Sequence, residues 1–228
     1  MAGVSIAVLQ SLPVFESMPV AQMEALGRLA SLRHVPRSTV VLREGEETNA
    51  IYFILNGALK VLVSDIEGRE VILTMLGRGE LFGEMGALDD NPRSATVVAT
   101  QPSDLVMISK VDFQQCLLNN FDVSLFIMRG LAKRLRLADR KIESLALLDV
   151  YGRVARLLLD LSEQEEGRRV INRRVTKQDI AKMIGASREM VSRVMKDLEN
   201  RGYFRVEEGR IVILEKRVPA APAPAPRP

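Results

Sequence analysis

Residues 121–148 have the pattern of one long, uninterrupted helix. These 28 residues contain no proline and a single glycine, Gly130. Apolar or small side chains recur at alternating steps of four and three residues, which is typical of a helix that pairs along its length with another helix. The spacing predicts a dimerisation helix; the alternative is an ordinary amphipathic core helix. The residues of this seam are Ser124, Met128, Leu131, Leu135, Ala138, Ile142 and Leu145.

The chain before this helix changes from helical to β-rich. Residues 19–32 have helical spacing. Residues 33–109 consist of short β-rich runs separated by glycines, which indicates a small all-β barrel or jelly roll. A short helix is expected at 110–119. The clearest β-rich runs are 51–55, 59–63 and 71–76.

The chain after the long helix predicts a second, smaller domain. A hinge at 149–152 precedes a helix over 153–163 and a charged loop over 163–174. Two short helices are expected at 176–184 and 187–201, followed by β runs at 203–207 and 210–214 that Glu208 and Gly209 join as a hairpin. Residues 218–228 are mostly alternating alanine and proline, which indicates a disordered tail.

Cysteine and histidine are too scarce for several kinds of site. A single cysteine, Cys116, excludes an internal disulfide and a cluster held by several thiolates. A single histidine, His34, leaves too few ligands for a zinc or haem site. A nucleophile–histidine–aspartate triad would have to use that one residue. We therefore expect no metal site and no hydrolase of this triad type.

Charge is distributed unevenly along the chain. Residues 1–148 carry 15 Lys and Arg against 17 Asp and Glu, whereas residues 149–217 carry 16 against 12. The basic C-terminal third indicates an anionic partner. No segment approaches the ~20 apolar residues of a membrane span, and the N-terminus lacks the basic start of a signal peptide. We expect a cytoplasmic protein with no membrane partner.

Residues 177–196 have the spacing of a helix-turn-helix. Ala181 is small where two helices would cross, and Gly185, four residues later, suits the backbone of the turn. Thr176 and Ser187 are suitable N-caps for the two helices. The second helix would expose four polar side chains near its N-terminal end, namely Arg188, Glu189, Ser192 and Arg193.

These residue types suit the reading of DNA. An arginine can bind O6 and N7 of guanine, and a glutamate can accept a hydrogen bond from cytosine N4. Thr176, Lys177 and Ser187 stand at helix N-termini, where backbone and side-chain donors can contact phosphates. The pattern therefore favours DNA binding over the alternative, a structural helix pair with a solvated charged face.

A loop in the β-rich region combines groups that suit a phosphate and a sugar. Gly83 and Gly86 let backbone N–H groups approach an anion closely. Glu84 offers a carboxylate to a sugar hydroxyl, Arg93 a planar fork to a phosphate, and Ser94 a hydroxyl donor. By itself this pattern could be a loop with an ion pair. Its place in a barrel ahead of a dimerisation helix favours a nucleotide site.

The chain resembles the CRP/FNR transcription regulators over about residues 12–215. The resemblance implies that Glu84 binds a ribose 2′-hydroxyl, and that Arg93 and Ser94 bind a cyclic phosphate. It also implies that Arg188, Glu189 and Arg193 read a TGTGA-like half-site. The passages that carry it are Gly83-Glu84-Met85 with Arg93-Ser94-Ala95, residues 145–153 (Leu-Ala-Leu-Leu-Asp-Val-Tyr-Gly-Arg), and Gly185-Ala186-Ser187-Arg188-Glu189 with Arg193.

This resemblance completes the expected fold, which is of the α+β class. A cyclic-nucleotide-binding β-roll, or jelly roll, is expected over 12–120, and the dimerisation helix over 121–148. A winged helix-turn-helix domain is expected over 149–217, and the disordered tail over 218–228.

Two positions on the long helix leave the ligand open. Cyclic AMP regulators of this family carry Thr–Ser or Thr–Asn where this chain has Ala138 and Asp139. Ala138 has no polar group, and an ionised Asp139 only accepts hydrogen bonds. A guanine edge offers two such donors, and Arg136 and Arg140 are close by in the sequence. The ligand is then a guanine-bearing cyclic nucleotide such as cyclic di-GMP, or cyclic AMP; alternatively, the pocket is vestigial and the protein binds DNA without a ligand.

The function expected is that of a bacterial, homodimeric, ligand-switched transcription regulator. Its partners would be double-stranded DNA with palindromic TGTGA-like half-sites and RNA polymerase, as for an activator of this family. The rival function is an enzyme controlled by a cyclic nucleotide. The residues after the dimerisation helix are used by the helix-turn-helix, which leaves no room for a catalytic domain.

Overall fold

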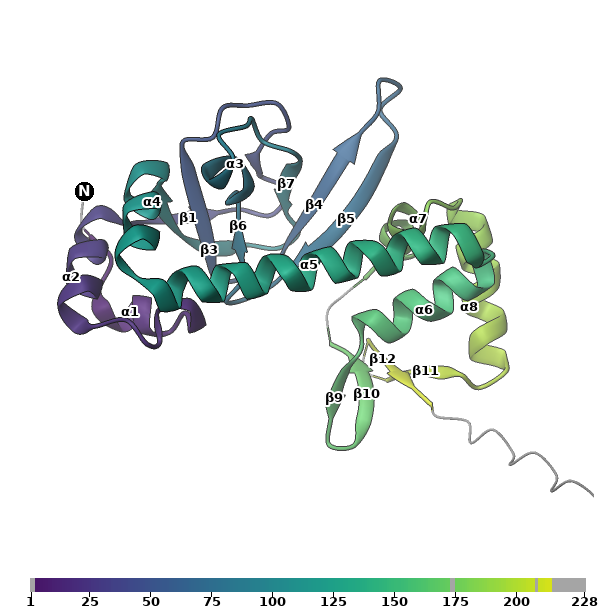
Figure 1. Ribbon diagram of the computed structural model, residues 1–228. Helices are drawn as coiled ribbons and strands as arrows, with labels where there is room; N and C mark the ends of the chain where they lie inside the picture. The colour runs from purple at the N-terminus through teal and green to yellow at the C-terminus, as the bar shows by residue number, and fades with distance from the viewer. Residues whose placement is uncertain (1–2, 173–174, 208, 215–228) are drawn as a thin grey trace, which may run out of the picture. The chain divides into compact units, whose positions relative to one another are not determined.

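The computed structural model describes residues 3–172, 175–207 and 209–214. They belong to two compact units, one that ends at Asp139 and one that begins at Arg140. The boundary lies inside the long helix α5 (Phe121–Leu147), which runs without interruption as the sequence predicts (Figure 1). In the described part of the chain, no helix is both long enough and apolar enough to cross a membrane.

The first unit is built on two four-stranded antiparallel sheets, ordered β1-β8-β3-β6 and β2-β7-β4-β5 (Figure 1). Buried residues from both sheets form one core, in which Ile54, Leu59 and Leu105 are fully buried. The predicted β-roll is confirmed. Its strands are β1 (Ser31–Val35), β2 (Val40–Leu42), β3 (Ala50–Asn56), β4 (Leu59–Ser64), β5 (Glu70–Leu76), β6 (Leu81–Phe82), β7 (Thr96–Ala99) and β8 (Ser103–Ser109).

A second core joins the helices of this unit to the other face of β3 and β8. Alternation along β3 sends Tyr52 and Ile54 into the core between the sheets and Ile51 and Phe53 toward the helices. The rings of Phe15 and Phe53 lie 5.1 Å apart. The helical elements are α1 (Ile6–Gln10), a 3₁₀ turn (Pro13–Phe15), α2 (Val20–Leu29), α3 (Met85–Leu88), α4 (Lys110–Asn119) and the start of α5.

The helix predicted over 19–32 is shorter in the structure. It ends at Leu29, and Ser31 and Leu32 already belong to β1. Ser31 pairs with Met107 and Leu32 with Val106 of β8. Pairing with a distant strand therefore overrides the local helical spacing at this end.

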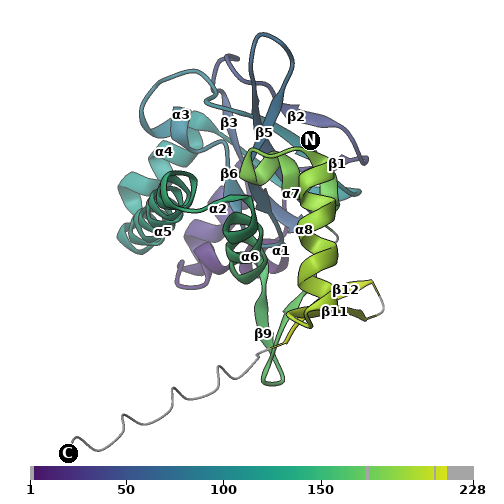
Figure 2. The same cartoon turned by 90° about the vertical axis from the view of Figure 1, so that its right-hand side faces the viewer.

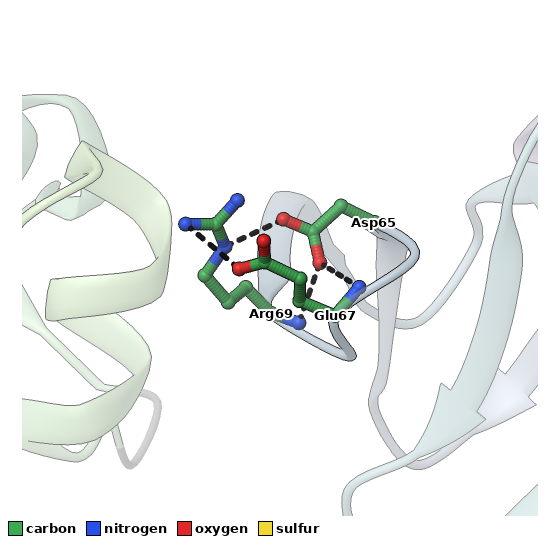
Figure 3. A network of polar contacts seen from close by, with 3 residues as sticks. All are labelled: Asp65, Glu67 and Arg69. Carbon is green, nitrogen blue, oxygen red and sulfur yellow. Dashed lines mark hydrogen bonds and ion pairs between the residues drawn. The ribbon is translucent and has the colours of Figure 1, made fainter.

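The β4–β5 hairpin ends in a turn that a polar network closes (Figure 3). Oδ1 of Asp65 accepts hydrogen bonds from the backbone N–H groups of Glu67 and Arg69, both at 2.9 Å. The Arg69 guanidinium lies 2.6 Å from the other Asp65 oxygen and 3.3 Å from the Glu67 carboxylate. The Arg69 side chain is the largest cause of a lowered pKa of Asp65. The network holds the turn in one backbone conformation.

The second unit packs three helices against a small antiparallel sheet of order β11-β12-β10-β9 (Figure 2). Its core draws Val154 from α6, Ile180 from α7, Val191 from α8 and Phe204 from β11. The predicted helix-turn-helix with a β wing is confirmed. Its elements are α6 (Val150–Leu161), β9 (Glu163–Glu165), β10 (Arg168–Ile171), α7 (Lys177–Ile184), α8 (Arg188–Asn200), β11 (Phe204–Glu207) and β12 (Arg210–Ile213).

Two predictions for this unit are wrong in detail. The loop expected over 163–174 contains the β9–β10 hairpin, because β10 pairs with β12, Val170 lying opposite Val212. Glu166 and Gly167, both with positive φ, form its turn. The helix expected from residue 153 begins at Val150, because the Asp149 carboxylate accepts a hydrogen bond from the Gly152 N–H at 2.8 Å.

Some predictions lie outside the described residues. These are the loop residues Arg173 and Arg174, Glu208 in the turn of the wing, and the tail over 218–228. Gly209, the other residue of that turn, is described and has a φ of 79°.

Gly185 gives a test of the turn between α7 and α8. Its φ of 64° and ψ of 49° are left-handed, and a Cβ there would meet nothing within 4 Å. Gly185→Ala should therefore lower the free energy of unfolding by about 1–2 kcal/mol through backbone strain alone. Gly130→Ala is the matched control, because Gly130 is helical in α5 and also has open space. That change should raise stability by about 0.5–1 kcal/mol. Urea denaturation measures both, and equal effects of the same sign would contradict the interpretation.

Candidate functional site

The loop after β6 places the predicted phosphate and ribose groups together. Gly83 has a φ of 79°, and a Cβ on it would lie 2.7 Å from an Nη of Arg93. A Cβ on Gly86 would lie 2.1 Å from Oγ1 of Thr48 and 2.3 Å from the Asn91 carbonyl oxygen. Both positions therefore require glycine for the loop to close on itself.

Helix α4 holds this loop from one side. The ammonium group of Lys110 lies 2.5 Å from Oδ1 of Asp90, and the Gln114 amide donates to the Ala87 carbonyl at 2.7 Å. Helix α4 is followed directly by α5. The contacts of α4 therefore tie the loop to the segment that leads into the long helix.

Arg93 lies under the loop rather than at its surface. It is 5% exposed, and it donates to the carbonyl oxygens of Gly83 at 2.7 Å and Ala50 at 2.6 Å. Burial lowers its pKa, although nearby anionic groups oppose the shift. These two bonds use two of the five N–H donors of a guanidinium, and they fix the plane of the group. The remaining donors can serve an anion in the loop.

The other predicted residues of the loop differ in exposure. Ser94 is exposed, and its hydroxyl lies 3.7 Å from the sulfur of Met85, which is itself half exposed. Ala95 is buried. A ligand approaching from solvent would therefore meet Ser94 and Met85 before Arg93.

Glu84 is 2% exposed and forms an ion pair with Arg134 of α5. Nη1 of Arg134 lies 2.5 Å from Oε1 of Glu84, and Nη2 donates to the Leu81 carbonyl. Burial raises the pKa of Glu84, while the nearby positive charge of Arg134 opposes that shift. The carboxylate predicted to bind a sugar hydroxyl is thus bonded to the long helix.

Sequence analysis missed Arg134. It lies within a run of basic residues on α5, and no local pattern distinguishes it from Lys133 or Arg136. One signal that could have found it is its place one turn before Ala138, the position at which the family resemblance implies that a base is read.

Ala138 and Asp139 are exposed on α5, one turn beyond Arg134. Four residues of helix correspond to about 6 Å along the axis. Among the described residues, Glu84 is bonded to Arg134 rather than to either of these two. The structure thus brings the loop to the same stretch of helix without joining the loop to Ala138 or Asp139.

The helix-turn-helix residues are positioned by two N-caps. Thr176 and Asp179 form a capping box, with the Thr176 hydroxyl accepting from the Asp179 N–H at 3.1 Å. The Ser187 hydroxyl accepts from the Met190 N–H at 3.2 Å and so starts α8. Both predicted caps are confirmed as caps. Lys177 is exposed on the first turn of α7.

Helix α8 separates an apolar face from a polar one. Val191, Met195 and Leu198 are buried against α6 and α7. Arg188, Glu189 and Arg193 are exposed, and Ser192 is partly exposed. The four predicted base-reading side chains therefore lie on the solvent side of the helix, near its N-terminal end.

Arg153 of α6 holds the turn that precedes α8. Its Nη1 donates to the Ile184 carbonyl at 2.8 Å, at the last residue of α7. Its Nε is buried and has no hydrogen-bond partner among the described residues.

In the part of the chain that the structure describes, no group of three or more His, Cys, Asp or Glu side chains could hold a metal ion.

The Glu84–Arg134 pair predicts a pH-dependent cost for losing the arginine. Arg134→Met leaves a buried carboxylate without its cation, which should lower the free energy of unfolding at pH 7.5 by about 2–3 kcal/mol. The figure is discounted because the Arg134 side chain is 39% exposed. Burial raises the pKa of Glu84 above its value in the unfolded chain, so the folded protein binds this proton more tightly than the unfolded chain does. The free energy of unfolding therefore falls as the pH rises through the raised pKa, and it recovers as the pH falls below it. Denaturation at pH 7.5 and 5.5 should show a smaller loss at pH 5.5.

The control is Arg134→Met combined with Glu84→Gln, in which neither side chain of the pair can ionise. Its loss of stability should not depend on pH over this range. An equal loss for the single variant at both pH values would contradict the assignment.

Comparison with known proteins gives two family matches. The cyclic nucleotide-binding domain family matches residues 32–120, and the Crp-like helix-turn-helix domain family matches residues 152–217. The first contains the loop with Glu84 and Arg93, and the second contains α7 and α8.

Individual proteins match most of the chain. The cAMP-activated global transcriptional regulator CRP of Pasteurella multocida is 34% identical over 189 residues, which covers 80% of this chain and 89% of that protein. The cAMP-activated regulator Vfr of Pseudomonas aeruginosa is 34% identical over 195 residues, covering 81% and 89%. The structure of the c-di-GMP-responsive regulator CLP of Xanthomonas campestris matches with a TM-score of 0.71 and 29% identity, covering 87% of this chain and all of that one. This chain therefore belongs to the CRP/FNR family of transcription regulators, with a cyclic-nucleotide-binding domain ahead of a DNA-binding helix-turn-helix domain.

Proposed function

We propose that this protein is a homodimeric regulator whose binding to DNA is set by a guanine-bearing cyclic nucleotide in the loop of Glu84 and Arg93. The observation that carries the proposal is the Glu84–Arg134 ion pair, because it ties the ligand loop to α5. A ligand that favours one arrangement of α5 over another shifts the population that is competent to bind DNA.

The ligand contacts follow from the chemistry of the loop. Arg93 and Ser94 bind the cyclic phosphate, and the backbone at Gly83, Met85 and Ala95 approaches it. Glu84 accepts a hydrogen bond from the ribose 2′-hydroxyl, for which it shares or exchanges its bond with Arg134. The names of CRP, Vfr and CLP, which respond to cyclic AMP or c-di-GMP, support a cyclic nucleotide as the ligand class.

Asp139 favours guanine over adenine at the base. A carboxylate can accept both N1–H and N2–H of guanine, whereas adenine offers one amino donor beside an acceptor nitrogen. Ala138 supplies no hydrogen bond to either base. Cyclic AMP, cyclic GMP and cyclic di-GMP are therefore the ligands to compare.

A ligand-free regulator is the second candidate. It is favoured by the hydrogen bonds that Arg93 and Glu84 already make to Gly83, Ala50 and Arg134. Such a protein would bind DNA with a vestigial pocket, and nucleotides would not change its affinity.

The dimer proposal rests on apolar side chains along α5. Met128, Leu135, Ile142 and Leu145 are each more than half exposed at seam positions. A second copy of α5 would cover them in a parallel pair. A two-fold dimer presents two α8 helices, which suits a palindrome of two TGTGA-like half-sites. RNA polymerase is the proposed protein partner, and the cytoplasm the proposed location.

Calorimetry of the purified protein against cyclic AMP, cyclic GMP and cyclic di-GMP tests the ligand. Charge-assisted bonds to both guanine donors correspond to about 1.5–3 kcal/mol, or a preference of roughly 10- to 150-fold for the guanine ligand. Asp139→Asn presents one acceptor to the edge, so guanine affinity should fall and adenine affinity should not. Tight cyclic AMP binding by the wild type, or guanine binding that ignores the substitution, would exclude this role for Asp139.

Arg193→Ala tests base reading by α8. Loss of the Arg193 guanidinium should weaken binding to a palindromic TGTGA-type operator by about 1–3 kcal/mol and reduce the sequence specificity at one base pair. Binding to random DNA should change little. Arg156→Ala is the control, because Arg156 is an exposed arginine of α6 near Asp160. Gel-shift titrations measure the affinity of each variant for the operator and for random DNA. An equal loss of affinity for both DNAs would show that Arg193 binds a phosphate and not a base.

A further inference from the structure

Met190 is an apolar residue on the polar side of α8. It is 46% exposed, whereas Val191, Met195 and Leu198 of the same helix are buried. Along α8, all of which the structure describes, it is the one large apolar side chain that is exposed. The core of the unit therefore does not require a methionine at this position.

The backbone of Met190 is fixed at the start of the helix. Its N–H donates to the Ser187 hydroxyl at 3.2 Å, which makes it the third residue after the cap. It follows Glu189 directly and precedes Arg193 by three residues, which is one turn. Both of those side chains are exposed. The Met190 side chain thus lies beside Arg193, one of the groups proposed to read bases.

We propose that Met190 recognises the C5-methyl group of one thymine in each half-site. The inference rests on the proposed role of α8 as the reading helix. In the major groove, hydrogen-bonding groups distinguish guanine, cytosine and adenine, and the methyl of thymine is the apolar feature. A thioether donates no hydrogen bond to phosphate and is flexible and polarisable, so it suits contact with a methyl group. Arg188, Glu189 and Arg193 would then supply the polar part of the recognition, and Met190 the apolar part.

Deoxyuridine provides a direct probe, because it lacks only this methyl and keeps the O4 acceptor of thymidine. The full-length protein is first used to select its own preferred site from a pool of random duplexes. Each thymine pair related by the dyad is then replaced by deoxyuridine, one pair at a time. Affinities are measured for the wild type, Met190→Ala and, as a control near the other end of the same helix, Glu199→Ala, which changes an exposed residue outside the proposed reading face.

The wild type should lose about 4-fold in affinity per half-site at one thymine pair, and so about 15-fold for the two half-sites, which is the effect of removing one methyl from an apolar contact. Met190→Ala should bind the thymine site more weakly and be indifferent to that replacement. Glu199→Ala should keep the wild-type affinity and the wild-type response to deoxyuridine. Because Met190 is exposed and outside the core, circular dichroism should show the variant folded as the wild type.

Two results would overturn the inference while leaving the proposed function intact. One is wild-type binding to the selected site that ignores deoxyuridine at every thymine pair. The other is an equal loss of affinity for the wild type and Met190→Ala when deoxyuridine replaces thymidine, which would show that another side chain contacts the methyl group. Selection that enriches no sequence would instead overturn the proposed function of α8, and the inference with it.

Discussion

A carboxylate that is 2% exposed requires either a compensating positive charge or a proton. For Glu84, the guanidinium of Arg134 provides the positive charge. That requirement has structural consequences in both directions. The loop that holds Glu84 is fixed to α5, and Arg134 is also fixed to β6, the strand before the loop, through a second bond to the Leu81 carbonyl. In the proposed function, a ligand hydroxyl that binds Glu84 shares or displaces the bond from Arg134, which would couple occupancy of the loop to α5. Arg93 is buried in the same loop but bonds to backbone carbonyls, so it fixes the loop rather than the helix.

The parts of the fold with local signatures could be predicted from the sequence. Thr176, Gly185 and Ser187 mark the helix-turn-helix because capping and left-handed backbone are decided within a few residues. The steps of four and three residues marked α5 for the same reason. The glycines at 83 and 86 marked the loop, because its close approaches leave no space for a side chain.

The parts that depend on distant contacts could not be predicted. Strand β10 has two charged and two apolar residues, and it becomes a strand because Val170 lies opposite Val212 of β12. Arg134 reaches a carboxylate 50 residues earlier in the chain, and Arg93 a carbonyl 43 residues earlier. The spacing of residues in the sequence does not predict which loop a helix will contact. Hence the predicted site contained the groups of the loop but lacked the helix residue that connects them to the rest of the molecule.

Ligand occupancy should be coupled to DNA affinity through Arg134. This coupling is measured as the ratio of DNA dissociation constants with and without saturating cyclic nucleotide, in the wild type and in Arg134→Met. We expect a wild-type ratio that differs from one by about 5- to 150-fold, the usual range of such couplings, and a ratio near one in the variant at saturating ligand. An unchanged ratio in the variant, or a wild-type ratio of one with every cyclic nucleotide, would contradict it.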